Sequence, residues 1–290
     1  MDLWYKQSQT RNLQMHIRVK NQLCYKKSDY QKIEVLDTPT YGKILTFDGN
    51  VVLTEKDEYI YDEMVTHVPM MVHPDIRNVL LVGDGDGGVI HELLKYDSVE
   101  NIDLVELDDM VNDVCEEFFP MHKKALEDER VCIHPMNAQK FLRKCKNRYD
   151  LVIVDANDPF GPGEGTYTRE FYGACYSALK EDGIMICQQG CPYGKDGVST
   201  LQKSHQQIAD IFPICKVYQA HIPSYQGGYW LFGFASKKYH PIDDFKPERF
   251  EKLDIRTDYY TSHIHVGAFY LPAFVERILK EVEDNVRAKH

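Results

Sequence analysis

The stretch NVLLVGDGDGGVIHELLKY, residues 78–96, decides the fold: an apolar run leads into a glycine-rich loop and then into a helical pattern. Further strand-like and helix-like stretches follow it in alternation. They are NIDLVELDDMVNDVCEEFF (101–119), VCIHPMNAQKFLRKC (131–145), YDLVIVD (149–155), a helix near 168–180 and GIMICQQ (183–189). This alternation predicts an α/β fold with a doubly wound parallel sheet and right-handed crossovers.

The flanking regions have other patterns. Residues up to about 75 look β-rich, with short strand-like runs separated by turn residues. They are QKIEVLDT (31–38), GKILTFDG (42–49) and NVVLTEKD (50–57). We therefore predict a small N-terminal β domain over 1–75 and a doubly wound catalytic domain over 76–290. Near the end, the runs 215–223 and 229–236 predict an antiparallel hairpin at the sheet edge, and residues 265–282 a final amphipathic helix.

Composition limits the possible partners. The 290 residues carry a net charge of −11, which argues against nucleic acid and suits a cationic ligand. No apolar stretch approaches the roughly 20 residues of a membrane helix, and the first residues lack the apolar core of a signal peptide. We therefore expect a cytoplasmic protein with reduced cysteines. Only Cys187 and Cys191 lie close together, so we expect no metal.

The glycine loop and an acid after it predict a nucleoside site. Glu106 ends the second strand, 23 residues after Gly83, where a carboxylate can accept hydrogen bonds from ribose hydroxyls. The alternative is a solvated strand end. Asp84 and Asp86 would repel a pyrophosphate and attract a cation, which favours an adenosyl sulfonium over NAD or ATP. Asp86 is also placed to cap the following helix, and both roles are compatible.

Two further carboxylates, Asp155 and Asp158, follow a buried strand on a loop stiffened by proline and glycine. At this point the chain resembles the spermidine synthases, or polyamine aminopropyltransferases, over nearly its whole length. The resemblance rests on LWYKQSQT (3–10), YQKIEVLDT (30–38), YGKILTFDG (41–49), TEKDEYIYDEM (54–64), GDGDGG (83–88), VELDDMV (105–111), VDANDPFGP (154–162), IPSYQGG (222–228) and HVGAFYLP (265–272).

The resemblance implies a methyltransferase-like Rossmann domain behind an N-terminal β-domain, in a homodimer or homotetramer. It implies transfer of the aminopropyl group of decarboxylated S-adenosylmethionine to a diamine, commonly putrescine, without a further cofactor. Spermidine and methylthioadenosine are the products. Catalysis is assigned to Asp155, which accepts the proton of the attacking amine, and to Tyr61, at the junction of donor and acceptor.

The resemblance also assigns the binding residues. For the amine they are Tyr61, Asp158, Gln188 and Tyr225. For the donor they are Gln31, Asp62, Gly83, Asp86, Glu106, Asn137 and Asp155. The alternative for Tyr61 is a strand tyrosine packed on the core, and for Tyr225 a plain hairpin-loop residue.

Five positions depart from the family pattern. Asp84 replaces a glycine, Asp62 replaces glutamine or histidine, Asn137-Ala138 replaces Asp-Gly, and Gln226-Gly227 replaces Pro-Ser. An acid often found just after Gln188 is missing. The departures near Gln188 and Gln226 leave cadaverine or a longer polyamine open as acceptor. Two rival functions also stay open: a methyltransferase that uses intact S-adenosylmethionine, and a non-catalytic nucleoside- or polyamine-binding protein.

Overall fold

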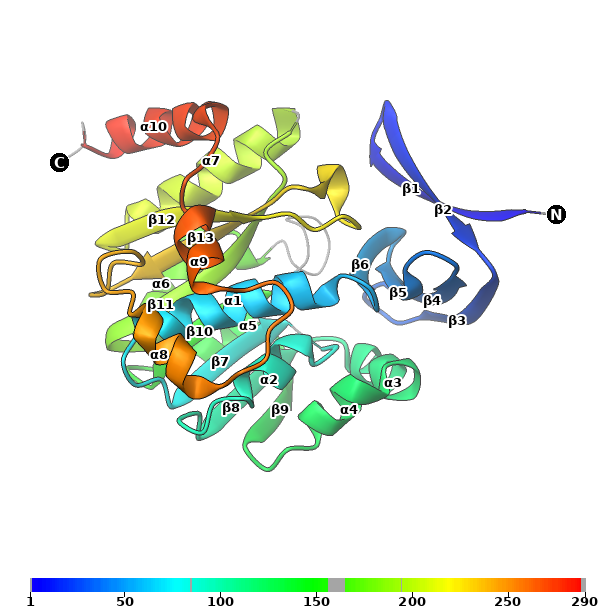
Figure 1. Cartoon of the computed structure of the whole chain (residues 1–290), viewed down its shortest axis with the longest axis horizontal. Helices are drawn as coiled ribbons and strands as arrows, with labels where there is room; N and C mark the ends of the chain where they lie inside the picture. The colour runs from blue at the N-terminus through cyan, green and yellow to red at the C-terminus, as the bar shows by residue number, and fades with distance from the viewer. Residues whose placement is uncertain (1, 84, 156–164, 194, 288–290) are drawn as a thin grey trace.

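The computed structural model describes residues 2–83, 85–155, 165–193 and 195–287. Its N-terminal part is made of two antiparallel sheets, drawn in blue in Figure 1. The first pairs β1 (Leu3–Thr10) with β2 (Leu13–Val19). The second has the order β3-β4-β5-β6, and its strands are β3 (Asn21–Lys27), β4 (Lys32–Thr38), β5 (Gly42–Phe47) and β6 (Asn50–Thr54). The predicted small N-terminal β-structure is therefore confirmed, and β1, β2 and β3 are added to it.

Helix α1 (Glu58–Val72) follows these strands, so the β-rich interpretation is wrong for this segment. Most of its side chains are buried, because the helix is covered by neighbours on several sides. A helix that is buried nearly all round lacks the one-sided apolar stripe by which an amphipathic helix is recognised in sequence. The predicted domain boundary after residue 75 stays a prediction.

A seven-stranded sheet forms the centre of the molecule, with the order β12-β13-β11-β10-β7-β8-β9. The five strands from β11 to β9 are parallel, and β13 runs antiparallel to both β11 and β12. The strands are β7 (Asn78–Gly83), β8 (Asn101–Glu106), β9 (Val131–Pro135), β10 (Tyr149–Asp155), β11 (Leu179–Gly190), β12 (Ile214–Ala220) and β13 (Trp230–Ser236). The predicted α/β class and the terminal hairpin are confirmed.

Helices alternate with these strands along the chain, as the sequence predicts (Figure 1). They are α2 (Gly88–Leu93), α3 (Asp109–Phe118), α4 (Pro120–Leu126), α5 (Ala138–Leu142), α6 (Arg169–Ala178), α7 (Lys195–Ala209), α8 (Pro247–Leu253), α9 (Ser262–Ala268) and α10 (Ala273–Arg287). The last two correct the prediction of one final helix. Pro272 lies between them, directly before α10, where a proline is tolerated; within a helix its missing backbone N–H costs a hydrogen bond, which favours a break here.

Both faces of the central sheet are buried, which is the condition for a parallel sheet. Along β10, Leu151 and Ile153 pack into the core that contains α1, whereas Val152 and Val154 pack into the core that contains α6. The helices therefore cover both faces, and in such sheets ligands bind at the carboxyl ends of the parallel strands.

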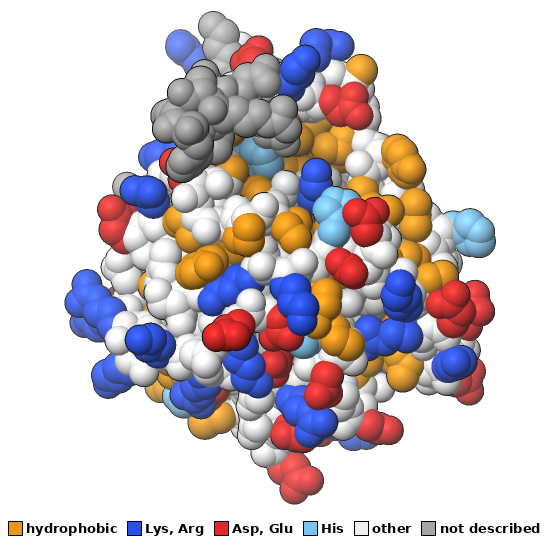
Figure 2. Space-filling model, turned by 90° about the vertical axis from the view of Figure 1, so that its left-hand side faces the viewer, with side chains coloured by type: hydrophobic (Ala, Val, Ile, Leu, Met, Phe, Trp, Pro, Cys, Tyr) orange, Lys and Arg blue, Asp and Glu red, His pale blue; other side chains and the backbone are white. Residues whose placement is uncertain are grey.

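The surface seen in Figure 2 has a mixed charge, with Lys and Arg side chains interspersed among Asp and Glu. Within the described parts of the chain, none of the helices combines the length and the apolar composition that crossing a bilayer requires.

Candidate active site

A cavity of about 850 Å³ lies at the carboxyl ends of β7, β8 and β10, where ligands bind in open α/β sheets. Ten of the eleven predicted site residues line it. They are Gln31, Tyr61, Asp62, Gly83, Asp86, Glu106, Asn137, Asp155, Gln188 and Tyr225. The eleventh, Asp158, lies outside the described residues. The fold thus brings the described set together from both parts of the chain, while the role of each residue stays a prediction.

Tyr61 and Asp155 form the centre of the cavity. Asp155 is the last residue of β10 and lies beside Gly83 at the end of β7. Tyr61 comes from α1, not from a strand, and its hydroxyl donates a hydrogen bond to Oδ1 of Asp155. The Tyr61 ring packs edge-on against Phe232 at 5.3 Å, so the phenol has a fixed direction. A helix residue and a strand end therefore meet where a substrate can reach both.

The Asp155 carboxyl has an unusual acidity. Burial raises its pKa to about 7, the charges of Asp86 and Glu106 add to the rise, and the hydrogen bond from Tyr61 opposes it. Burial and the neighbouring Asp155 carboxylate also raise the pKa of Tyr61, so its phenol stays a donor. A carboxyl with a pKa near neutrality is suited to exchange a proton with a bound substrate.

Glu106 occupies the neighbouring strand end, β8, where its Oε1 accepts a hydrogen bond from the backbone N–H of Asp108 at 2.9 Å. Burial raises its pKa to about 7, with repulsion from Asp108 and Asp86 as further causes. The loop passes very close to it, since a Cβ on Gly85 would lie 3.1 Å from Oε2 of Glu106. Glycine at this position leaves room for the acid.

Asp86 begins the turn into α2. Its Oδ1 accepts a hydrogen bond from the backbone N–H of Gly88, the first residue of α2, at 2.9 Å, but the N-cap position itself is Gly87, so Asp86 lies one residue before the cap. Behind it, His122 lies between two acids, with Nδ1 3.8 Å from Asp86 Oδ1 and Nε2 3.6 Å from Glu58 Oε1. Burial lowers the pKa of His122, but these two acids outweigh it, so the net shift is upward.

Gln31 and Asn137 are both engaged within the protein. The amide of Gln31 donates to Oδ2 of Asp108 at 3.1 Å, which ties the N-terminal sheet to the start of α3. The side-chain oxygen of Asn137 accepts from the backbone N–H of Lys140 at 3.2 Å and so caps α5. Asn137 therefore offers a ligand its amide hydrogens more readily than its oxygen.

The other end of the cavity is aromatic and amidic. Tyr225 precedes the turn of the β12–β13 hairpin, its ring centre is 6.0 Å from that of Tyr61, and its hydroxyl donates to the backbone oxygen of Val52 at 2.8 Å. Trp230 packs edge-on against Tyr225 at 4.9 Å, and the buried Gln188 comes from β11. Trp230 lines the cavity and was missed by the sequence reasoning, although it lies two residues after the quoted motif IPSYQGG (222–228).

The tip of the β1–β2 hairpin was also missed. Residues 7–12 line the cavity, and the amide of Gln226 donates to the backbone oxygen of Gln9 at 3.4 Å. Four of these residues stand in the quoted stretch LWYKQSQT (3–10), but polar residues at a hairpin tip carry no chemical motif of their own, so the sequence analysis assigned them no role in the cavity.

The cavity lining is strongly acidic. Among the described residues that line it, seven are Asp or Glu and only Arg11 is basic. Acidic walls of low dielectric attract cations and disfavour anions. The arrangement suits a positively charged ligand, as the sequence predicts.

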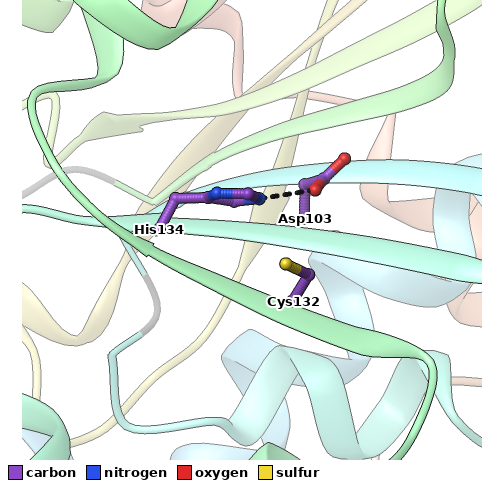
Figure 3. Close-up of side chains that lie close together, drawn as sticks. All are labelled: Asp103, Cys132 and His134. Atoms are coloured by element: carbon purple, nitrogen blue, oxygen red, sulfur yellow. Dashed lines mark hydrogen bonds and ion pairs between the residues drawn. The ribbon is translucent and has the colours of Figure 1, made fainter.

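Among the described residues, one group outside the cavity has metal-ligand chemistry: Asp103, Cys132 and His134, on the neighbouring strands β8 and β9 (Figure 3). Both oxygens of Asp103 are engaged. Oδ1 pairs with His134 at 2.6 Å, and Oδ2 accepts from Arg148 at 2.6 Å and from Tyr149 at 2.9 Å. Because this carboxylate is already neutralised by its neighbours, we interpret the group as an ion-pair network.

Comparison with known proteins identifies the family. The spermine/spermidine synthase domain model matches residues 58–246, and the spermidine synthase tetramerisation domain model matches residues 3–55. The polyamine aminopropyltransferase of Lachnospira eligens is 52% identical over 284 residues, which cover 98% of this chain and all of that protein. That of Streptococcus pneumoniae is 50% identical over 283 residues, with 98% and 99% coverage.

Solved structures agree with this. A spermidine synthase in complex with the transition-state analogue AdoDATO superposes with a TM-score of 0.93 at 38% identity, over 96% of this chain and 95% of that one. The spermidine synthase from Thermotoga maritima gives 0.92 at 36% identity, over 96% and 94%. Similarity over the full length, in both parts of the chain, shows that this chain belongs to the spermine/spermidine synthase family and is a polyamine aminopropyltransferase.

Proposed function

We propose that the protein transfers the aminopropyl group of decarboxylated S-adenosylmethionine to putrescine, giving spermidine and methylthioadenosine. The observation that carries this choice of donor is the acidic cavity lining around Asp155 and Glu106. Intact S-adenosylmethionine would bring a carboxylate among these acids, and Arg11 is the only basic residue among the described lining residues. A decarboxylated donor avoids that repulsion. No further cofactor is needed in this proposal.

The chemistry follows from the charges. The amine nitrogen attacks the aminopropyl carbon attached to sulfur, the C–S bond breaks toward the sulfonium, and a neutral thioether leaves. An alkylammonium with a pKa of about 10.4 must first lose a proton, and at neutral pH this costs about 4–5 kcal/mol. Asp155 accepts that proton, and Tyr61 orients the carboxylate through its hydrogen bond. Asp158 remains the predicted second amine ligand.

The proposed acceptor end lies between Tyr61, Tyr225, Trp230 and Gln188, and the donor end between Glu106 and Asp86. This division follows from the order of the strands. Gln188 on β11 and Trp230 on β13 lie on one side of Asp155, which ends β10. Glu106, which ends β8, lies on the other side, beyond β7. Holding carbon and nitrogen in line between the two ends contributes several kcal/mol.

The direct test supplies decarboxylated S-adenosylmethionine with putrescine, cadaverine, agmatine or spermidine in separate reactions, and follows methylthioadenosine release. We expect the largest kcat/KM with putrescine, and a loss of turnover without a loss of donor binding in Asp155→Asn. A larger kcat/KM with another amine would replace putrescine. Methylated amine formed from intact S-adenosylmethionine would revive the methyltransferase hypothesis.

We also propose that the protein works in the cytoplasm as a homodimer or homotetramer assembled through its N-terminal sheets. The match to a tetramerisation domain supports this. Leu3 and Trp4 on β1, Leu13 on β2 and Tyr25 on β3 are each more than half exposed, and exposed apolar side chains on these strands favour an interface. Light scattering gives the mass in solution, and Trp4→Glu should lower it.

A further inference from the structure

Asp57 is a buried carboxylate that the reaction described above does not use. It immediately precedes α1, in the position where an Asp normally caps its own helix, yet its side chain caps nothing there. Instead, Oδ1 accepts hydrogen bonds from the hydroxyls of Thr54 at 2.6 Å and Ser224 at 2.8 Å, and Oδ2 accepts from the backbone N–H of Ser224 at 2.8 Å. One carboxylate thus joins the end of β6, the start of α1 and the β12–β13 hairpin.

The residue that Asp57 holds is next to the cavity wall. Ser224 is fully buried and directly precedes Tyr225. On the other side of Tyr225, Gly227 and Gly228 both adopt positive φ, a backbone conformation that glycine reaches without strain. Ser224, before Tyr225, is therefore held by hydrogen bonds to the Asp57 carboxylate. The residues after Tyr225 include two glycines, which have more backbone freedom.

Asp57 is also close in sequence to the opposite wall, because Tyr61 lies on the first turn of the helix that follows Asp57. The rings of Tyr61 and Tyr225, whose centres are 6.0 Å apart, therefore belong to the two segments that meet at Asp57. A buried carboxylate is costly unless its oxygens accept hydrogen bonds, so the three hydrogen bonds to Asp57 hold its side chain in place.

We propose that Asp57 is a positioning residue for the acceptor amine: it holds Tyr225 at a fixed distance from Tyr61 and Asp155. This rests on the proposed function, in which the amine lies between the two tyrosines. At the donor end, Gly83, Asp86 and Glu106 come from β7, β8 and the turn before α2, and none of them bonds to Asp57. The predicted donor residue Asp62 shares α1 with Tyr61, so the donor end depends less on Asp57 than the acceptor end does.

The chain offers a matched control in Glu63. This acid of α1 is equally buried, and its carboxylate accepts backbone hydrogen bonds from Asp258, Tyr259 and Tyr260 at 2.6–2.9 Å. It therefore also ties α1 to a distant loop through a buried carboxylate, but neither Glu63 nor that loop lines the main cavity. A purely structural role would make the two acids equivalent.

The experiment compares Asp57→Asn, Ser224→Ala and Glu63→Gln by thermal unfolding and by steady-state kinetics with each substrate varied. We expect Asp57→Asn to raise KM for the amine by about tenfold, the size expected when a hydrogen bond to a charged group is lost, with KM for the donor within about twofold. Ser224→Ala, which keeps the backbone contact, should give a smaller rise. Glu63→Gln should lower the melting temperature and leave both KM values within about twofold.

Equal effects of Asp57→Asn and Glu63→Gln on the amine KM would overturn the proposal, and so would an equal rise in the donor KM. If Asp57→Asn does not fold, an amine KM in Ser224→Ala equal to that of the wild type overturns it. Failure of the proposed function looks different, because the wild-type protein itself would then release no methylthioadenosine with any diamine.

Discussion

Removing the hydroxyl of Tyr61 should shift the pH–rate profile to higher pH, rather than lower the rate by the same factor at every pH. In the wild-type protein, burial raises the pKa of Asp155 to about 7, and the Tyr61 hydrogen bond limits that rise. Only the ionised carboxylate can accept the amine proton. We therefore expect kcat/KM to increase with pH through an inflection near 7.

The size of the displacement follows from the lost hydrogen bond. A hydrogen bond to a charged group is worth about 1.5–3 kcal/mol, which corresponds to about one to two units of pKa. Tyr61→Phe should therefore move the inflection to about 8–9. At pH 7 the ionised fraction of Asp155 then falls from about one half to between about one tenth and one hundredth, so activity falls about 5- to 50-fold.

The assay measures initial rates of methylthioadenosine release at low substrate concentration from pH 6 to about 9.5. Activity of Tyr61→Phe should recover toward that of the wild type at the alkaline end. Tyr218→Phe is the matched control, because Tyr218 is a buried tyrosine that stacks on the same Phe232 and does not line the cavity. A loss by the same factor at every pH in Tyr61→Phe would refute the reasoning.

Three further perturbations have defined outcomes. Gly85→Ala places a methyl group 2.9 Å from Val111 and 3.1 Å from Glu106, so it should raise KM for the donor several-fold and spare KM for the amine; unchanged donor kinetics would contradict the geometry. His122 has a raised pKa in the folded protein, so its stabilising contribution is present below about pH 6.5 and fades as pH rises through the raised value. His122→Gln should thus lose more stability at pH 6 than at pH 9, as measured by urea unfolding. Leu81→Ala empties a fully buried position in the central sheet and should cost about 3 kcal/mol of unfolding free energy; a loss below about 1 kcal/mol would mean that the core repacks.

The parallel sheet could be predicted because its strands are short apolar runs in strict alternation with helices. The ends of those strands, Gly83, Glu106 and Asp155, followed directly, since the carboxyl ends of neighbouring parallel strands meet at one edge. The meeting of Gln31, Tyr61 and Tyr225 with this edge depends on tertiary packing. The residues alone did not predict it, and those positions came from the family resemblance.

Other features escaped prediction for physical reasons. Helix α1 is buried nearly all round. Exposed and less exposed positions alternate along β1, β2 and β3, but in β1 the less exposed positions include Gln7 and Gln9, so its sequence shows no apolar alternation. Pro272 indicates the break between α9 and α10, but the prediction of one final helix did not take this proline into account. Asp57 carries no motif of its own, because its function depends on a serine 167 residues later.

The hairpin tip at residues 7–12 has a practical consequence for work with this protein. The segment that matches a tetramerisation domain also forms one wall of the cavity that contains Tyr61 and Asp155. Shortening the N-terminus to obtain a simpler assembly, or fusing an affinity tag there without a spacer, would therefore alter the cavity together with the quaternary state. Kinetic constants from such preparations would describe a different enzyme, and a tag is better attached at the other end of the chain.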